Sequence, residues 1–350
     1  MKEANGRPTA FSCREDTTSH AGEEHRLELG VIRTTDYHTG GEPFRIVTGG
    51  VEPLRGATIL DKRRDALARL DHVRRLLVLE PRGHADMYGC HVVPPNDDGA
   101  DLGVVFFHNA GYSTACGHGT IALVTWAIDE GIVCKREGEV RVVVDVPSGR
   151  LETWARVERG RVCSVRFRNV PAFVWATGLA AGRLEVDVAF GGAFYASIRE
   201  RVEPRELPRL IELGRTIKRA VEAEHDVVHP LERELGDLYG VIFWQEESGE
   251  PLTQRNVTVF ADGEVDRSPC GSGTSARLAL LDAAGLLPAG AALRHLSIVG
   301  SAFIGRVVAR TEVAGRPAVV TEVEGTAFRT GTAEFVLDPE DELGAGFLLR

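Results

Sequence analysis

The chain has 350 residues, 43% of them hydrophobic and 26% charged, and a formal net charge of −10. This composition is that of a globular protein with a sizeable core, and the length fits two domains of ordinary size. The acidic balance argues against a nucleic-acid or anionic-membrane partner, because phosphate binding needs clustered Lys and Arg side chains.

Residues 1–26 are polar and have no apolar period, so we expect a disordered leader in which Cys13 is incidental. No signal segment opens the chain and no apolar run approaches membrane-spanning length, so a reduced cytoplasmic protein is expected. The alternation over residues 27–32 predicts a strand. Residues 35–43 are rich in polar and turn-forming residues and are expected to form a loop.

The rest of the chain alternates helical and strand-like patterns. Leucines and valines at helical spacing predict a surface amphipathic helix at residues 63–77 and another helix at 207–224. A polar loop is expected at residues 80–87. Apolar or alternating runs predict strands at 102–108, 140–146, 151–157, 162–167, 184–190, 239–244 and 256–260.

A cysteine followed by Gly-x-Gly-Thr occurs twice, at Cys116 and at Cys270. Each copy runs into an apolar stretch with helical spacing, so both thiols are predicted at helix N-termini. The first turn of a helix carries free N–H groups and partial positive charge, which lowers the pKa of a thiol. The glycines allow close approach of a carboxylate to those N–H groups. The sequence contains neither a Cys-x-x-Cys pair nor two closely spaced Cys/His couples, so it gives little support for a structural zinc site.

The two copies lie close to half the chain length apart, and each follows a predicted strand and turn. This layout indicates an α+β protein of two pseudo-symmetric domains, each a curved, mostly antiparallel sheet around a central helix. We expect residues 27–150 with 327–350 to form one domain and residues 151–326 to form the other. Both helix starts would then lie at the interdomain cleft.

Six short motifs carry a family resemblance. They are Asp36-x-His38-Thr39-x-Gly41, Glu80-Pro81-Arg82-Gly83-His84, Cys116-Gly117-His118-Gly119, Gly191-Gly192-x-Phe194-Tyr195, Asp266-Arg267-Ser268-Pro269-Cys270-Gly271-x-Gly273-Thr274 and Gly300-Ser301-x-Phe303-x-Gly305-Arg306. Together they resemble the proline racemase family, which includes proline racemases, 4-hydroxyproline 2-epimerases and trans-3-hydroxyproline dehydratases. The resemblance implies a diaminopimelate-epimerase-like fold, no cofactor and a homodimer.

Inversion of an amino-acid α-carbon requires removal of a proton from one face and delivery of a proton to the other. A thiolate and a thiol at Cys116 and Cys270 can do this in both directions. The substrate carboxylate would gain enolate character against backbone N–H groups, which we assign to Gly117, His118, Gly271 and Ser272. The resemblance implies that Asp266 and His118 contact the ring nitrogen, and that His38, Phe194 and Tyr195 border the pocket.

Within the family that the chain resembles, cysteine at both motif positions implies a racemase or epimerase acting on proline or 4-hydroxyproline. Residues 111–114 instead look more like the dehydratase branch, and Ala115 stands where methionine is common in the family, so trans-3-hydroxy-L-proline dehydratase is an alternative. A protein that binds proline-like ligands without turnover is an alternative of another class. Asp266 could also simply cap the turn before the second helix, and Phe194 and Tyr195 are as well suited to a core.

Overall fold

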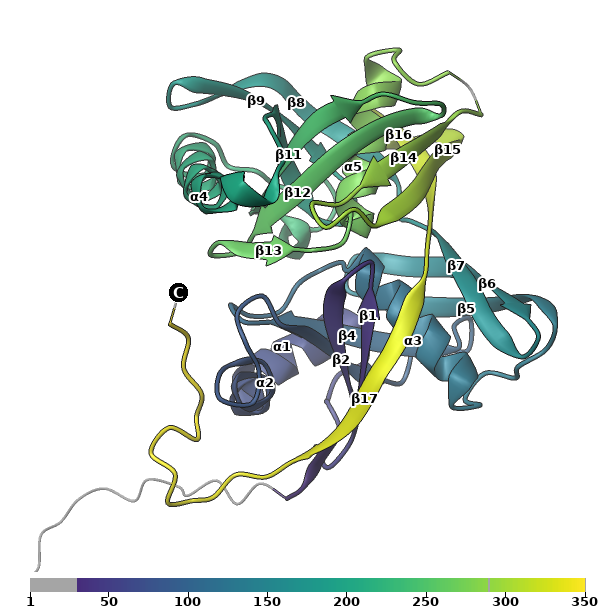
Figure 1. Ribbon diagram of the computed structural model, residues 1–350, viewed down its shortest axis with the longest axis vertical. Helices are drawn as coiled ribbons and strands as arrows, with labels where there is room; N and C mark the ends of the chain where they lie inside the picture. The colour runs from purple at the N-terminus through teal and green to yellow at the C-terminus, as the bar shows by residue number, and fades with distance from the viewer. Residues whose placement is uncertain (1–29, 289, 350) are drawn as a thin grey trace, which may run out of the picture.

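The computed structural model describes residues 30–288 and 290–349 (Figure 1). The expected leader, residues 1–26, lies outside these ranges. The helices are α1 (Ile59–Arg69), α2 (Asp71–Val78), α3 (Gly117–Asp129), α4 (Leu207–Glu224) and α5 (Gly271–Ala283), with short 3-10 turns at Pro204–Glu206 and Arg233–Leu235. The strands are β1 (Ile32–Thr39), β2 (Glu42–Gly49), β3 (Tyr88–Val93), β4 (Leu102–His108), β5 (Gly138–Val146), β6 (Gly149–Glu158), β7 (Arg161–Arg168), β8 (Ala172–Ala181), β9 (Leu184–Phe190), β10 (Phe194–Arg199), β11 (Leu238–Glu247), β12 (Leu252–Phe260), β13 (Glu264–Asp266), β14 (Ala292–Leu296), β15 (Ala302–Val313), β16 (Arg316–Gly325) and β17 (Ala327–Phe335).

The strands form one continuous hydrogen-bonded network, so the fold is α+β and rich in sheet. Most neighbouring strands are antiparallel, as the sequence predicts. Parallel pairing joins β2 to β3, β4 to β5, β10 to β11 and β12 to β14. All the strands predicted from residue 102 onwards are confirmed. Strand β8 was missed, because its apolar residues do not alternate and Gly178 interrupts them.

Two buried helices stand at the centre of the two halves seen in Figure 1. Helix α3 contacts β1, β7 and β17, whereas α5 contacts β8, β15 and β16. Helix α3 has no charged residue before Asp129, which is the pattern of a helix covered on all sides. Strand β7 and nearly all of β6 lie beyond residue 150, yet both strands contact α3. The predicted division into residues 27–150 with 327–350 and 151–326 stays a prediction.

The prediction of one helix at residues 63–77 is wrong, because two helices meet at Leu70. Leu70 has φ −120° and ψ 16°, outside the helical range, and ends α1 while starting α2. Helix α1 begins at Ile59, four residues before the predicted start, and Thr58 caps it through a capping box with Asp61. Helix α4 has the predicted bounds.

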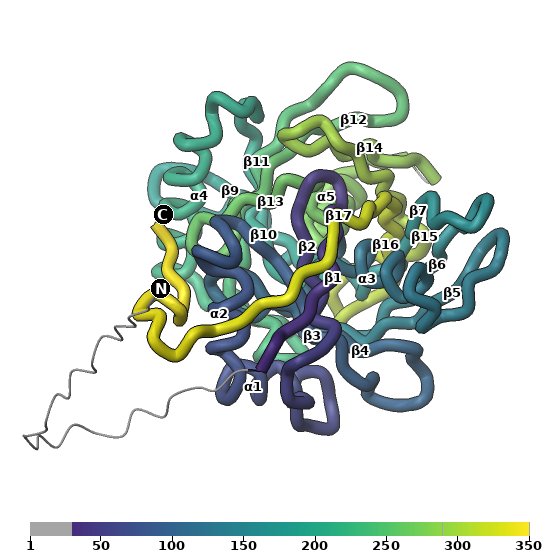
Figure 2. Tube along the Cα trace, turned by 60° about the horizontal axis from the view of Figure 1, so that its bottom comes forward, coloured from purple at the N-terminus to yellow at the C-terminus, as the bar shows by residue number. Residues whose placement is uncertain are grey.

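The loop predicted at residues 35–43 is also wrong. Strands β1 and β2 form an antiparallel hairpin whose turn is Gly40–Gly41, both with positive φ. Strand β17, from the far end of the chain, pairs with the other edge of β1 (Figure 2). This long-range pairing hydrogen-bonds the backbone of a polar segment that reads locally as a loop. In the described part of the chain, no helix is long and apolar enough to cross a membrane.

Candidate active site

The N-termini of α3 and α5 meet inside the molecule. Cys116 is the N-cap of α3, and Cys270 is the N-cap of α5. The next residues, Gly117 and Gly271, abut: a Cβ built on Gly117 would lie 2.5 Å from the Cα of Gly271. Such an approach excludes any side chain at these positions, since real Cβ contacts are not this short. The glycines therefore bring the two thiol-bearing helix starts together.

Both thiols line one internal cavity. The predicted residues around it are Cys116, Gly117, His118, Tyr195, Asp266, Cys270, Gly271 and Ser272. The cavity volume is about 10 Å³, which is room for about one water molecule. A ligand as large as a proline ring therefore requires its walls to move apart.

Cys116 is held among polar groups although it is 5% exposed. Its Sγ accepts the Gly119 N–H at 3.3 Å, as expected at a helix start. Both ring nitrogens of His118 lie 3.5 Å from the same sulfur. Burial raises the pKa of the Cys116 thiol well above its usual range, and the charges of Asp266 and Cys270 raise it further.

Cys270 occupies a strained position at the start of α5. Its φ is 61°, in the left-handed region that non-glycine residues rarely adopt. Its Sγ lies 3.8 Å from the Tyr195 hydroxyl, which is 2.7 Å from Ser272 Oγ. Burial raises the pKa of Cys270 to about 12, and the Asp266 charge adds to the effect.

The predicted lowering of the thiol pKa values is therefore wrong for the cavity as it stands. The helix N–H groups do act in the predicted direction, because the Gly119 and Gly273 amides lower the two pKa values. Removal of both sulfurs from water has the larger effect, since burial penalises the thiolate. Both cysteines are therefore neutral thiols at neutral pH when the cavity holds no positively charged ligand.

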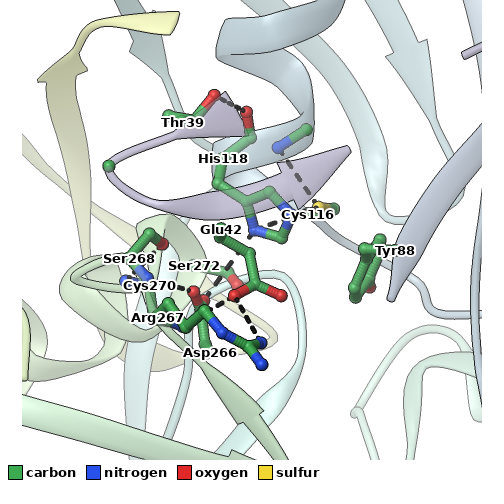
Figure 3. A network of polar contacts seen from close by, with 12 residues as sticks. Thr39, Glu42, Tyr88, Cys116, His118, Asp266, Arg267, Ser268, Cys270 and Ser272 are labelled. Atoms are coloured by element: carbon green, nitrogen blue, oxygen red, sulfur yellow. Dashed lines mark hydrogen bonds and ion pairs between the residues drawn. The ribbon is translucent and has the colours of Figure 1, made fainter. Parts of the chain in front are cut away.

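Asp266 and His118 face each other beside the thiols (Figure 3). The His118 Nδ1 lies 3.8 Å from the Asp266 Oδ2. Burial lowers the pKa of His118 to about 3, so its imidazole is neutral. Burial raises the pKa of Asp266 to about 6, which leaves it an anion at neutral pH. Its Oδ1 accepts the Ser268 N–H at 2.8 Å, so Asp266 also caps the turn before α5.

Two predicted pocket residues do not line this cavity. The His38 Nδ1 accepts the Gly41 N–H at 3.3 Å, and its ring lies 5.5 Å from Phe328. Phe194 is fully buried in the core against Phe173 and Phe190. Successive residues of a strand point to opposite faces, so Tyr195 reaches the cavity while its neighbour Phe194 does not.

Several residues near the thiols were missed from the sequence. Tyr88, Tyr239, Thr258 and Phe260 line the cavity. The Tyr88 hydroxyl bonds to the Tyr239 hydroxyl at 3.0 Å. Glu42 lies behind the cavity wall and is fully buried. Only Glu42 had a local signal, a carboxylate directly after a Gly-Gly turn; the others come from strand ends that meet only in the fold.

Comparison with known proteins decides the family. The family model for proline racemase matches residues 34–348, which include both cysteines and Asp266. This chain belongs to the proline racemase family. Its fold is proline racemase-like, and the chain is an enzyme of that family.

Two relatives in the proline racemase family illustrate its range. The chain is 45% identical over 329 residues to a 3-hydroxyproline 2-epimerase of Burkholderia multivorans, covering 91% of this chain and 98% of the relative. It is 44% identical over 328 residues to a trans-3-hydroxy-L-proline dehydratase of Bacillus thuringiensis subsp. konkukian, with the same coverage.

Solved structures of the proline racemase family share the fold. A hydroxyproline epimerase from Agrobacterium vitis, crystallised with trans-4-hydroxy-L-proline, has a TM-score of 0.85 at 31% identity, covering 91% of this chain and 96% of that one. A probable proline racemase from Agrobacterium radiobacter also has a TM-score of 0.85, at 30% identity and the same coverage.

Proposed function

We propose that this member of the proline racemase family inverts the α-carbon of proline or a hydroxyproline, without a cofactor, through Cys116 and Cys270. The observation that carries the proposal is the pair of thiols on one cavity, each at the start of a buried helix. Inversion needs an acid and a base on opposite faces of one carbon. Two sulfurs on two facing helices meet that need, and simple binding would require neither.

The charges around the thiols suggest how the base is generated. Asp266 is the anion that would receive the secondary ammonium of the substrate. The incoming cation would offset the carboxylate charge that raises the pKa of both thiols. One thiol would then release its proton to water as the substrate binds, and the resulting thiolate would abstract the α-proton while the other thiol would protonate the opposite face. The next turnover would run in the reverse sense.

The substrate carboxylate would occupy the junction of the helix starts. The N–H groups of Gly117, His118, Gly271 and Ser272 lie in the first turns of α3 and α5, where orphan donors and the helix dipoles favour an anion. The same donors would stabilise the enolate oxygens that form when the α-proton leaves. This role follows from their place at helix starts and needs no side-chain charge.

A second candidate is trans-3-hydroxy-L-proline dehydratase. Relatives with that name are 41–44% identical to this chain over 91% of its length. The first step would be the same α-proton abstraction by a thiolate. The 3-hydroxyl of the trans isomer lies on the same ring face as the α-hydrogen, so the thiol that has just taken the α-proton would pass it to the hydroxyl, which leaves as water and restores the thiolate. The resulting enamine would tautomerise to a cyclic imine. One site could thus support either outcome, depending on the ring substituent.

Incubation in heavy water with L-proline, trans-4-hydroxy-L-proline and trans-3-hydroxy-L-proline separates the candidates. Epimerisation predicts an inverted product with one α-deuterium, and dehydration predicts a cyclic imine from the 3-hydroxy compound only. A protein that binds without turnover would show affinity but no α-deuterium. Absence of both deuterium and imine with all three compounds would refute the proposed function. The homodimer and the cytoplasmic location stay predictions.

A further inference from the structure

Glu42 is a carboxyl group buried without solvent contact immediately behind the catalytic thiols. It is the first residue of β2, and its side chain is 0% exposed. Its Oε2 accepts the backbone N–H of Arg267 at 2.7 Å. Its Oε1 is buried and has no hydrogen-bond partner among the described residues. An ionised carboxylate with one bare oxygen in such a place is costly, whereas a carboxylic acid is much less so.

The surroundings of Glu42 are poor in positive charge. The Arg267 guanidinium lies 3.6 Å from Glu42 but 3.0 Å from Asp86, so its ion pair with Asp86 is the stronger of the two. Asp266, Arg267, Cys116 and His118 lie around Glu42 in Figure 3. Asp86, before β3, is a further charged group that acts on Glu42. The Arg267 guanidinium is thus shared among the carboxyl groups of Glu42, Asp86 and Asp266.

We propose that Glu42 is a positioning residue that carries a proton in the working enzyme, so that Asp266 is the single anion offered to the ammonium group of the substrate. The proposal rests on the proposed function for its catalytic meaning, but the protonation itself does not. Burial and the Asp266 charge both raise the pKa of Glu42 well above its usual range, in agreement with this state.

The protonation state of Glu42 has a direct consequence for the thiols. If Glu42 were ionised, its charge would raise the pKa of Cys116 further, and this second buried anion would oppose the developing enolate. Ionisation of Glu42 at high pH should therefore reduce activity. Replacement by glutamine keeps the size and the neutral state, and its amide can still accept the Arg267 N–H.

Infrared difference spectroscopy of the substrate-free protein at pH 7 tests the protonation itself. Wild type minus Glu42→Gln should show the C=O stretch of a protonated carboxylic acid. The matched control Glu52→Gln, at a side chain 70% exposed, should show only carboxylate bands. Carboxylate bands alone from Glu42→Gln would overturn the proposal. So would failure of this variant to fold, because a neutral amide should replace a neutral acid.

The pH profile of kcat/KM tests the catalytic role. Glu42→Gln should keep activity within about threefold of wild type at neutral pH, and the alkaline decline should move to higher pH. A loss of more than about 100-fold, or an unchanged alkaline limb, would contradict the role. Because the infrared experiment uses no substrate, it stands even if no tested compound is turned over, so failure of the proposed function is recognised separately.

Discussion

Gly117 and Gly271 are in direct backbone contact, and this contact sets the separation of the two thiol-bearing helices. A Cβ on Gly117 would lie 2.5 Å from the Gly271 Cα and 2.9 Å from the Phe167 ring. No rotamer change can relieve the first contact, because its partner is backbone. The distance between the Cys116 and Cys270 sulfurs therefore depends on the absence of two methyl groups.

We expect Gly117→Ala to separate the helix starts and to lower both stability and turnover. Forcing a methyl group into this junction should cost about 1–3 kcal/mol of unfolding free energy and at least about 100-fold in kcat/KM, through misplacement of the thiols. Urea denaturation and racemisation assays measure the two effects. Gly331→Ala is the matched control, because a Cβ there meets nothing within 4 Å. Equal behaviour of the two variants would show that the contact is unimportant.

Asp266→Asn should weaken substrate use, because it removes the anion that we propose for the ring nitrogen. Loss of a charged hydrogen bond of about 1.5–3 kcal/mol corresponds to a decrease of about 10- to 100-fold in kcat/KM. The effect should be smaller on binding of a ring analogue that lacks the ammonium group. An unchanged kcat/KM would place the ring nitrogen elsewhere.

Asp266 should also make stability depend on pH. Its pKa rises from 3.8 in the unfolded chain to about 6 in the fold, so its neutral form is favoured by folding. The resulting stabilisation is complete below about pH 4 and is lost as pH rises through about 6, up to about 3 kcal/mol. Between pH 4 and pH 7, the unfolding free energy of wild type should therefore fall relative to that of Asp266→Asn. A gap independent of pH would contradict the shift.

Arg45 links the Asp36 motif to the end of α2 and to the loop that follows it. Its guanidinium pairs with Asp36 at 2.7 Å and donates to the Leu77 and Arg82 carbonyls at 2.6 Å and 3.0 Å. Arg45→Met should destabilise the protein by about 1.5–3 kcal/mol, because the partly buried Asp36 carboxylate loses its charged hydrogen bonds. Arg33→Met, which breaks an exposed pair with Glu334, should cost no more than about 1 kcal/mol. Similar denaturation midpoints for the two variants would refute this assignment.

The sequence predicts what is local in this site and misses what is assembled over long distances. The helix starts at Cys116 and Cys270 follow from glycine spacing and apolar period, both properties of adjacent residues. Glu42 was predicted to lie in a loop, because its strand β2 pairs with β1, and β1 is held on its other edge by β17, almost three hundred residues away. The direction of the thiol pKa shifts was missed for the same reason, since burial of the sulfurs depends on both halves of the chain.

Helix bounds could likewise be predicted only where the local sequence pattern determines them. Helix α4 was predicted to the residue because its apolar stripe faces one surface throughout. The break at Leu70 was not, since the leucine spacing continues across it and only the backbone of that residue changes. Tyr88 and Tyr239 meet through their hydroxyls from distant strands, and neither segment alone carries a sign of the other.

The most direct test of the two-thiol account compares α-proton exchange with inversion in Cys116→Ser and Cys270→Ser, in heavy water, starting from the L and from the D substrate. Each variant should exchange deuterium into at most one of the two configurations and should lose inversion by at least about 100-fold, while Cys134→Ser, at an exposed thiol, should behave as wild type. Undiminished inversion in either active-site variant would contradict the account.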